Sequence, residues 1–425
     1  MKRAIVVGSG AGGAAIAREL QGKFQVVVLE SGNSFHPFSQ NLKMIEKVKK
    51  TGLLFNERQI QWLFPTMRIS KTSDGMVLVK GIGQGGTTTI CAGNAVRQDQ
   101  DLKAIGINLD AEFQELAKEI PVYTDHRKKW HGLTKEVFDI CRDMKLQPQP
   151  TPKMGRRELC TGCGKCVLGC SWGAKWDSRI YLNQAVENGA EVISGCNVQK
   201  VLIENGRALG VIARKSWHAR FYPADLIILA AGGLGTPEIL QKSGIKCQSK
   251  LFVDPVLCVA TKWNKARQNQ EIPMPFIIQK EHFIISPYFD FLSFFFNRNW
   301  NYPAGDIYSL MIKLADVNTG NVARKSLSAI DKTRINDGIN CCKEIYYKLG
   351  KKDSDIFVGT LNAGHPGGMF PLTEEDSQTM RNKRLPPNLY IADASLLPNS
   401  LGNPPILTIA AMAKRIGKLC CEPIC

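Results

Sequence analysis

The first thirty residues alternate between apolar runs and a segment of small residues. Residues 4–7 are all apolar and predict a short buried strand, residues 14–20 predict a helix, and residues 25–29 predict a second strand. A strand, a helix and a second strand in this order are typical of a parallel sheet covered by helices. The N-terminus therefore predicts an α/β fold.

Apolar runs of the same kind return in the middle and near the end of the chain. Residues 226–231 and 389–393 predict buried strands, and residues 198–212 predict a hairpin. We expect a helix to begin near Pro237, because proline is favoured in the first turn of a helix. The stretch 250–315 is β-rich and aromatic. The pattern predicts one discontinuous domain built from both termini and the centre, with a second domain inserted.

The loop after the first strand points to a dinucleotide. Gly8, Gly10 and Gly13 fit the pattern G-x-G-x-x-G, with Gly12 beside them. The first glycine of this pattern permits a tight turn, the second lets a pyrophosphate approach the backbone, and the third lets helix and strand pack closely. Glu30 ends the second strand. An acid there accepts hydrogen bonds from a ribose hydroxyl and disfavours the 2′-phosphate of NADP.

The basic start of the chain, Met1-Lys2-Arg3, also fits the beginning of a secretion signal. The strand interpretation is the stronger one, because the glycine loop needs a strand before it. On that interpretation we expect no export signal and a reducing, cytoplasmic location. The 14 cysteines are then thiols or metal ligands rather than disulfides.

Composition narrows the function classes further. With 425 residues, 44% hydrophobic and 22% charged, the chain is neither disordered nor of low complexity. It contains no run of 18 apolar residues that would predict a membrane-spanning helix. The net charge of +17 favours an anionic partner. Because no nucleic-acid-binding module is recognisable, we expect no nucleic-acid partner and favour an acidic electron-acceptor protein or anionic lipid headgroups. The sequence does not indicate an oligomeric state.

Four separated segments together resemble the glucose–methanol–choline (GMC) oxidoreductases, a family of flavoproteins. They are residues 7–13 with 29–32, residues 83–88, residues 229–237, and residues 364–368 with 389–395 and Asn403-Pro404. The resemblance implies bound FAD, a Rossmann-like FAD-binding domain, an inserted β-sheet substrate domain, and oxidation of an alcohol by hydride transfer to the flavin. The expected boundaries are 1–130 with 175–245 and 385–425 for the FAD-binding domain, 131–174 for a cysteine-rich segment, and 246–384 for the substrate domain.

The same resemblance implies which residues hold FAD. The ADP-binding unit is matched by Gly8, Gly10, Gly12, Gly13 and Glu30. The loop beside the flavin and pyrophosphate is matched by Gly85, Gly86 and Thr87, and the backbone that approaches adenine by Val198. The remaining matches to cofactor-binding positions are Ala231, Gly232, Asp393, Ala394, Asn403 and Pro404.

Two residues match the catalytic positions of the family. His365 matches its active-site histidine, and Asn403 lies where a second catalytic residue is found. An imidazole with a pKa near 6.5 suits removal of a hydroxyl proton, and an asparagine can hold the alkoxide by a hydrogen bond. A packed or solvated side chain is the alternative interpretation of a single histidine. The segment after His365, residues 366–370, departs from the commoner Gly-Thr-x-x-Met-Gly of the family.

Cys160, Cys163, Cys166 and Cys170 follow C-x2-C-x2-C-x3-C, the spacing of a bacterial ferredoxin run. It predicts a 4Fe–4S cluster that passes electrons singly from FAD to an external acceptor, and hence a dehydrogenase rather than an oxidase. One cluster requires Cys170 to bend back toward the other three, or a remote cysteine to serve. Residues 169–175 also resemble the branch that includes long-chain alcohol oxidases, so a structural zinc or a loop of free thiols stays open.

The aromatic stretch 283–300 has three interpretations: the core of the inserted sheet, the wall of a pocket for a lipophilic alcohol, or a peripheral contact with a membrane. Its triplet, residues 294–296, cannot face one side of a strand. Two other functions also stay open. One is a flavin-dependent reductase or isomerase acting on a lipophilic substrate, and the other is a non-catalytic electron-transfer subunit.

Overall fold

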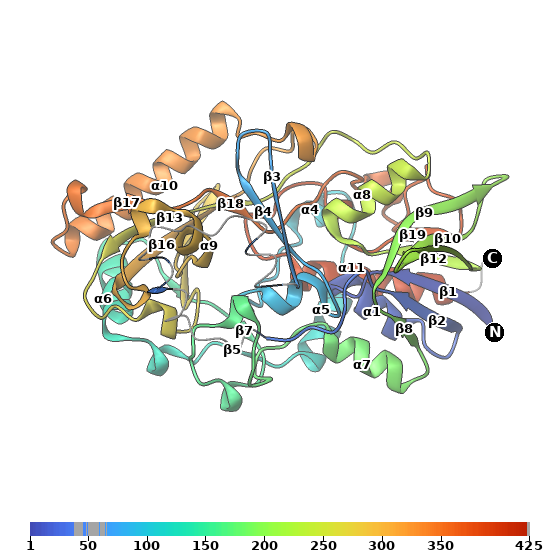
Figure 1. Cartoon of the computed structure of the whole chain (residues 1–425), viewed down its shortest axis with the longest axis horizontal. Coiled ribbons are helices and arrows are strands. Elements are labelled where there is room, and N and C mark those ends of the chain that lie inside the picture. Colours follow the sequence, from blue (N-terminus) through green and yellow to red (C-terminus); the bar gives the residue numbers. More distant parts are fainter. Residues whose placement is uncertain (38–45, 48, 50–58, 60–63, 65, 423–425) are drawn as a thin grey trace.

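The computed structural model of the chain is elongated, with one large sheet toward each end (Figure 1). It describes residues 1–37, 46–47, 49, 59, 64 and 66–422. The two chain ends marked in Figure 1 lie at the same end of the molecule, beside the first sheet. Among the described residues, no helix is both long and apolar enough to cross a membrane.

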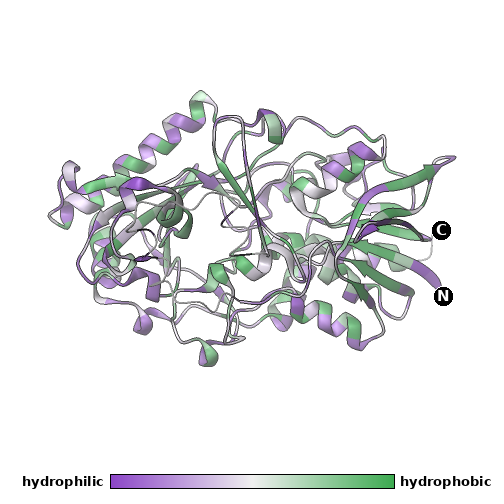
Figure 2. Cartoon of the chain, viewed as in Figure 1, coloured by the Kyte–Doolittle hydropathy of each residue, from purple (hydrophilic) through white to green (hydrophobic). Residues whose placement is uncertain are grey.

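The first sheet is parallel and has the order β19-β12-β1-β2-β8. Its strands are β1 (Lys2–Val7), β2 (Phe24–Leu29), β8 (Glu191–Ile193), β12 (Leu226–Leu229) and β19 (Leu389–Ile391). The interiors of β1, β2 and β12 are buried on both faces, as expected for parallel strands under helices. Figure 2 colours these strands mainly as hydrophobic. This arrangement confirms the predicted α/β fold and draws its strands from three separated parts of the chain.

Helices cover this sheet and bring distant segments together. They are α1 (Ala11–Glu19), α7 (Arg179–Glu187), α8 (Gly232–Lys242) and α11 (Ile406–Cys421), with α5 (Asp110–Glu119) packed on α11. We expected a helix to begin near Pro237, but α8 begins at Gly232 and contains Pro237. Pro237 is the sixth residue of α8 and lies inside the helix, beyond the four N-terminal residues whose N–H groups have no intrahelical partner. The proline therefore does not mark the first turn.

The predicted hairpin is a small antiparallel sheet beside the parallel one. It consists of β9 (Cys196–Glu204), β10 (Arg207–Lys215) and β11 (His218–Pro223). Asn205 and Gly206 both have positive φ at the turn between β9 and β10, as a tight two-residue hairpin turn requires.

The second large sheet has the order β3-β4-β18-β13-β16-β15-β14-β6, and β17 pairs with β13. The strands are β3 (Met67–Lys71), β4 (Val77–Gly81), β6 (Gln149–Pro150), β13 (Pro255–Lys262), β14 (Phe276–Gln279), β15 (Phe283–Pro287), β16 (Ile307–Leu314), β17 (Ile356–Val358) and β18 (Asn362–Ala363). We assigned residues 1–130 to the FAD-binding domain, yet β3 and β4 belong to this second sheet. The expected boundary therefore does not coincide with the division between the sheets.

The remaining elements surround the second sheet or link the two. They are α4 (Gln100–Ala104), α6 (Gly132–Asp143), α9 (Phe291–Phe296), α10 (Ala329–Lys348), and a two-stranded ladder of β5 (Val122–Tyr123) and β7 (Lys153–Met154). The aromatic triplet, residues 294–296, lies in helix α9. Because it is not in a strand, its three side chains do not have to face one side of a sheet. Phe294 is fully buried against Phe289, whereas Phe295 contacts Phe64. This confirms the core interpretation for part of the aromatic stretch.

Candidate active site

A large cavity among the described residues lies at the carboxyl ends of β1, β2 and β12. We call it the cofactor cavity, and its volume is about 630 Å³. Cavities at this edge of a parallel sheet are the usual ligand sites of α/β folds. The predicted cofactor-binding residues that line it are Gly8, Gly10, Gly12, Glu30, Gly86, Thr87, Val198, Ala231, Gly232, Asp393 and Ala394. The structure thus brings most of the predicted cofactor-binding residues together, although they come from six separate segments of the chain.

Gly12 and Gly13 show why this wall is made of glycines. A Cβ atom on Gly12 would lie 1.6 Å from the carbonyl oxygen of Ala392, and one on Gly13 would lie 2.0 Å from that of Gly8. Gly10 differs from both, because a Cβ there would meet no atom within 4 Å. Gly12 and Gly13 therefore allow close backbone packing, and Gly10 faces the open cavity at the start of α1.

The carboxylate of Glu30 connects three loops around the cavity. Its Oε2 atom accepts hydrogen bonds from Ser9 N at 3.0 Å and from Ser9 Oγ at 2.7 Å. Its Oε1 atom accepts from the backbone N–H groups of Gly32 at 2.9 Å and Gly83 at 3.2 Å. Glu30 therefore holds the loops after β1, β2 and β4 at the rim where the sequence predicts the ribose.

Asp393 makes a similar bridge at the opposite wall. Its Oδ2 atom accepts from Gly232 N at 2.9 Å and from Thr236 Oγ1, and its Oδ1 atom accepts from Ser395 N at 2.8 Å. Burial raises the pKa of this carboxyl. Asp393 thus fixes the start of α8 against the end of β19, and both loops face the cavity.

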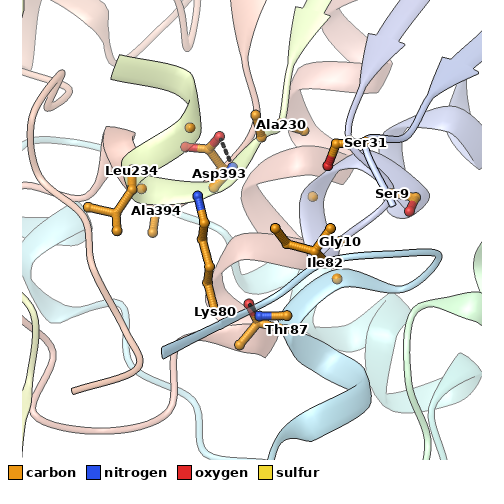
Figure 3. Close-up of a pocket in the computed structure, with 18 of the residues that line it drawn as sticks. Ser9, Gly10, Ser31, Lys80, Ile82, Thr87, Ala230, Leu234, Asp393 and Ala394 are labelled. Carbon is orange, nitrogen blue, oxygen red and sulfur yellow. Dashed lines mark hydrogen bonds between the residues drawn. The ribbon is translucent and has the colours of Figure 1, made fainter. Parts of the chain in front are cut away.

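Sequence reasoning missed the positive charge of this cavity. Arg68, Lys80 and Lys242 line it, and Figure 3 shows the side chain of Lys80 reaching from β4 toward Asp393 and Leu234. Burial lowers the pKa of Lys80, and Glu238 opposes this shift. Lys242 already donates to Glu238, at 2.6 Å. A cavity with a glycine-lined helix start and a half-buried lysine fits a dinucleotide with two phosphate charges, such as FAD.

A second cavity, of about 160 Å³, adjoins the first and is mostly apolar. We call it the apolar cavity. Its walls include Met274, Tyr288, Phe291, Leu292 and Phe295, so part of the aromatic stretch also forms a pocket. The residues that line both cavities are Thr87, Cys91, Gly364, His365 and Ile406. His365 therefore stands where the two cavities meet.

Asn403, the other predicted catalytic residue, lies elsewhere. Its side chain is buried, donates to Gln279 Oε1 at 3.2 Å, and is not among the residues lining the two cavities. Its Oδ1 atom is buried and has no hydrogen-bond partner. Pro404 lines the apolar cavity, and Gly85 supports the cofactor loop from behind by donating its N–H to Ser9 Oγ at 3.2 Å. The catalytic role of Asn403 stays a prediction.

The unusual residues after His365 have a packing explanation. Gly367 and Gly368 cross over the ring of Phe252, where a Cβ on either would lie 2.5 to 2.7 Å from ring carbons. Gly368 also has a positive φ of 80° and donates its N–H to the carbonyl of Ala394. This loop is therefore tied directly to the wall of the cofactor cavity.

Two buried charged groups that were not predicted from the sequence lie behind His365. His365 Nδ1 lies 3.3 Å from Asp254 Oδ2, and the same oxygen accepts a hydrogen bond from Lys313. Asp254 and Lys313 are 1% and 2% exposed, whereas the His365 side chain keeps 22% exposure toward the cavities. Burial and Lys313 lower the pKa of His365, and Asp254 opposes them. The lowered pKa favours the neutral imidazole, the form that can accept a proton.

The four patterned cysteines line one further cavity. Cys160, Cys163, Cys166 and Cys170 share it with Tyr123, Lys153 and Lys175. Cys170 lines the same cavity as the other three cysteines. Among the described residues, however, no three His, Cys, Asp or Glu side chains are grouped so that they could hold a metal ion. The structure thus gives no direct support for bound zinc or for a cluster.

The cysteine cavity lies next to the apolar cavity. Ala92 lines both, and Val167 and Leu168, from the turn between Cys166 and Cys170, line the apolar cavity. The buried ammonium of Lys175 joins the walls by donating to the carbonyl oxygens of Thr89 at 2.7 Å and Cys166 at 2.9 Å.

The chain matches the model of a known enzyme family over more than half of its length. The family model described as GMC oxidoreductase matches residues 4–257. The chain belongs to the GMC oxidoreductase family. It is accordingly an FAD-binding oxidoreductase, and the cofactor cavity is where its residues fit FAD.

Relatives of this GMC chain fall into two groups by coverage. It is 24% identical to an uncharacterised protein of Methanocaldococcus jannaschii over 96% of this chain and 97% of the relative. It is 30% identical to an uncharacterised GMC-type oxidoreductase of Mycobacterium tuberculosis and 29% identical to a long-chain-alcohol oxidase of Arabidopsis thaliana. Those two matches cover 61% and 57% of this chain but only 42% and 34% of the relatives.

Solved structures share the fold over nearly the whole chain. Pyridoxine 4-oxidase from "Mesorbium loti" matches with a TM-score of 0.73 and 14% identity, over 98% of this chain and 99% of that one. Formate oxidase of Aspergillus oryzae matches with a TM-score of 0.71 and 12% identity, over 98% and 97%. Together they confirm the predicted combination of a Rossmann-like FAD-binding region and a sheet domain.

Proposed function

We propose that this protein oxidises a lipophilic alcohol, with His365 as the base that takes the hydroxyl proton. The observation that carries the proposal is the position of His365 between the cofactor cavity and the apolar cavity. When bound, FAD supplies the acceptor for the hydride of the carbinol carbon. A base at this junction can reach a hydroxyl whose hydrocarbon part lies in the apolar cavity. The long-chain-alcohol oxidase among the relatives supports the substrate class.

The residues of the chain supply orientation, proton transfer and exclusion of water. Apolar side chains such as Phe291 and Leu292 hold the hydrocarbon part and keep water out. His365 accepts the proton at Nε2, the ring nitrogen away from Asp254. Thr87 and Cys91 line both cavities and so border the reacting carbon.

The test is the reduction of bound flavin by alcohols of increasing chain length, followed anaerobically by flavin absorbance. We expect His365→Gln to retain FAD and to be reduced at least about 100-fold more slowly than the wild type. His282→Gln is the matched control, because His282 is 41% exposed beside Glu281, outside the cavities.

Bleaching at the wild-type rate in His365→Gln would reject the base assignment. If no alcohol bleaches the wild type, alcohol oxidation is rejected. Turnover of a lipophilic substrate that needs reduced flavin would then favour a reductase or isomerase, and retention of cofactors without any substrate reaction would favour an electron-transfer subunit.

We also propose, as a second function of the chain, that the four cysteines bind a 4Fe–4S cluster and pass electrons to an acidic one-electron carrier protein. This proposal is supported by the shared cavity of all four sulfurs and by its common wall with the apolar cavity. Lys153 and Lys175 add buried positive charge, which suits an anionic cluster. Each thiolate of a cubane binds a different iron, so its ligands spread more widely than those of one metal ion.

Anaerobic purification with iron, sulfide and flavin analysis tests the cluster. We expect about four iron and four sulfide per chain, and loss of both in Cys166→Ser but not in Cys247→Ser. Cys247 is the control because its thiol donates to Pro237, away from the cysteine cavity. Zinc without iron, or no metal in the anaerobic wild type, would reject the relay and the argument for a dehydrogenase.

The expected cytoplasmic location and membrane contact stay proposals.

A further inference from the structure

Three strands of the second sheet, β13, β16 and β18, place charged groups directly behind His365. Asp254 precedes β13, and Lys313 lies on β16, where it pairs with Val256 of β13. On the other side of β13, Pro255 pairs with Ala363 of β18. Continuing this antiparallel register places His365 beside Val253, and its N–H lies 3.4 Å from the Val253 carbonyl. The sheet register therefore brings Lys313 and His365 to the same carboxylate.

The carboxylate of Asp254 is contacted by three side chains and held in one orientation. Its Oδ2 atom accepts from Lys313 and faces His365 Nδ1, and its Oδ1 atom accepts from Ser400. The backbone has a positive φ of 52°, a conformation that aspartate and asparagine adopt more readily than most residues. The N–H of Asp254 donates to Asp316 Oδ1 at 2.9 Å. Carboxylate and backbone of Asp254 are both fixed.

Asp316 belongs to a second buried ion pair. It lies 2.6 Å from the ammonium of Lys325, and both side chains are 0% exposed. Lys325 also donates to the carbonyl oxygens of Leu251 and Val317. The group behind His365 thus contains two carboxylates and two ammonium ions, whose formal charges cancel.

We propose that Asp254 and Lys313 are positioning residues for His365, and that Ser400 orients Asp254. Asp254 accepts the Nδ1–H of the imidazole, which leaves Nε2 as the acceptor that faces the cavities. Lys313 balances the negative charge of Asp254. The carboxylate therefore selects the tautomer of the imidazole without stabilising the doubly protonated, cationic ring. This inference concerns the same site as the proposed alcohol oxidation and rests on it for its kinetic test.

The charge balance decides the pH at which the base works. Among the described residues, the charged groups that act on the pKa of His365 are Lys313, which lowers it, and Asp254, which raises it, with burial lowering it further. Asp316 and Lys325 form the next ion pair, behind Asp254 and Lys313 as seen from His365. Because a histidine is a base only above its pKa, activity falls as pH decreases through that value. Changing either charged neighbour should therefore move the acid limb of the pH profile.

The first experiment is the pH profile of kcat/KM for alcohol-dependent flavin reduction in matched variants. We expect Lys313→Met to move the acid limb about one pH unit or more upward, which lowers kcat/KM about tenfold at a pH below the limb. We expect Asp254→Asn to move the limb downward and to lower the plateau. Asparagine suits this test because it tolerates the positive φ of Asp254.

The double variant, Asp254→Asn with Lys313→Met, removes both charges together. We expect its acid limb to return toward the wild-type position while its plateau stays low, because charge balance is restored but the acceptor for Nδ1–H is altered. Asp254→Asn or Lys313→Met alone leaves one buried charge without its partner and can therefore fail to fold. The double variant and Lys313→Arg avoid this, because the first removes both charges and the second keeps both. Lys313→Arg should keep the wild-type limb. Identical limbs in every folded variant would overturn the proposal.

The second experiment needs no catalysis. In ¹⁵N-histidine-labelled holoenzyme, His365 is assigned by comparison with His365→Gln, and its ring-nitrogen shifts report which nitrogen carries the proton. We expect the proton on Nδ1 in the wild type. A proton on Nε2 would overturn the positioning role. If no alcohol reduces the wild type, the proposed function fails, and this measurement still decides the role of Asp254.

Discussion

The cofactor cavity and the apolar cavity share His365 but are built in different ways. Backbone forms much of the cofactor cavity, where glycines let loops approach within contact distance of carbonyl oxygens. Side chains from separate elements form the apolar cavity, including Met274, Tyr288 and Met311. A backbone wall demands glycine at fixed positions, whereas many combinations of apolar side chains can fill an apolar wall.

The largest expected effect comes from breaking the backbone wall. We predict that Gly12→Ala destabilises the fold by about 4 kcal/mol or more, because the added Cβ would lie 1.6 Å from the Ala392 carbonyl oxygen. Thermal unfolding of the purified protein, or its absence from the soluble fraction, measures this effect.

Gly10→Ala is the matched control for that prediction. Its Cβ has no neighbour within 4 Å, and its φ of −70° suits any residue. We expect this variant to keep its melting temperature but to bind FAD at least about tenfold more weakly, because the methyl group projects into the cofactor cavity. Equal stability of the two variants would show that the close contact of Gly12 does not constrain the fold.

This contrast explains what the sequence could predict. Gly8, Gly12 and Glu30 are recognisable because their spacing follows one continuous strand–loop–helix–strand unit. The parallel strands were also predictable, since each is a short apolar run next to a glycine turn. The start of α8 was not, because its first residues are the glycines of the cofactor loop, and these give no helix signal.

The residues behind His365 could not be predicted from local pattern. Lys313 and Asp254 lie far apart in the sequence, and only the pairing of β13 with β16 and β18 brings them to His365. One signal did exist, because Lys313 interrupts the apolar run 307–314 and Asp254 follows the run 251–253. A charge inside a buried strand requires a buried partner, but the sequence does not say which one.

A smaller effect should come from the charge of the cofactor cavity. We predict that Lys80→Met raises the Kd for FAD about tenfold, because a half-buried ammonium that faces this cavity would be lost while the backbone wall stays intact. Titration of the apoprotein with FAD, followed by flavin fluorescence, measures the change. Lys200→Met is the control, since Lys200 is exposed on β9. An unchanged Kd in Lys80→Met would mean that backbone groups alone hold the phosphates.

The smallest expected effect tests the apolar cavity. Burial raises the pKa of the Tyr288 hydroxyl well above its usual value, so it stays a hydrogen-bond donor at the cavity wall. We predict that Tyr288→Phe raises KM for alcohols by about two- to tenfold, the effect of one lost hydrogen bond, and by the same factor for short and long chains. Leu292→Ala, at the same wall, should instead raise KM more for longer chains, because it removes only apolar contact. Steady-state kinetics over a series of primary alcohols separates the two. A chain-length dependence in Tyr288→Phe would place this ring against the hydrocarbon part of the substrate rather than its hydroxyl, and would leave His365 as the polar group that orients the alcohol.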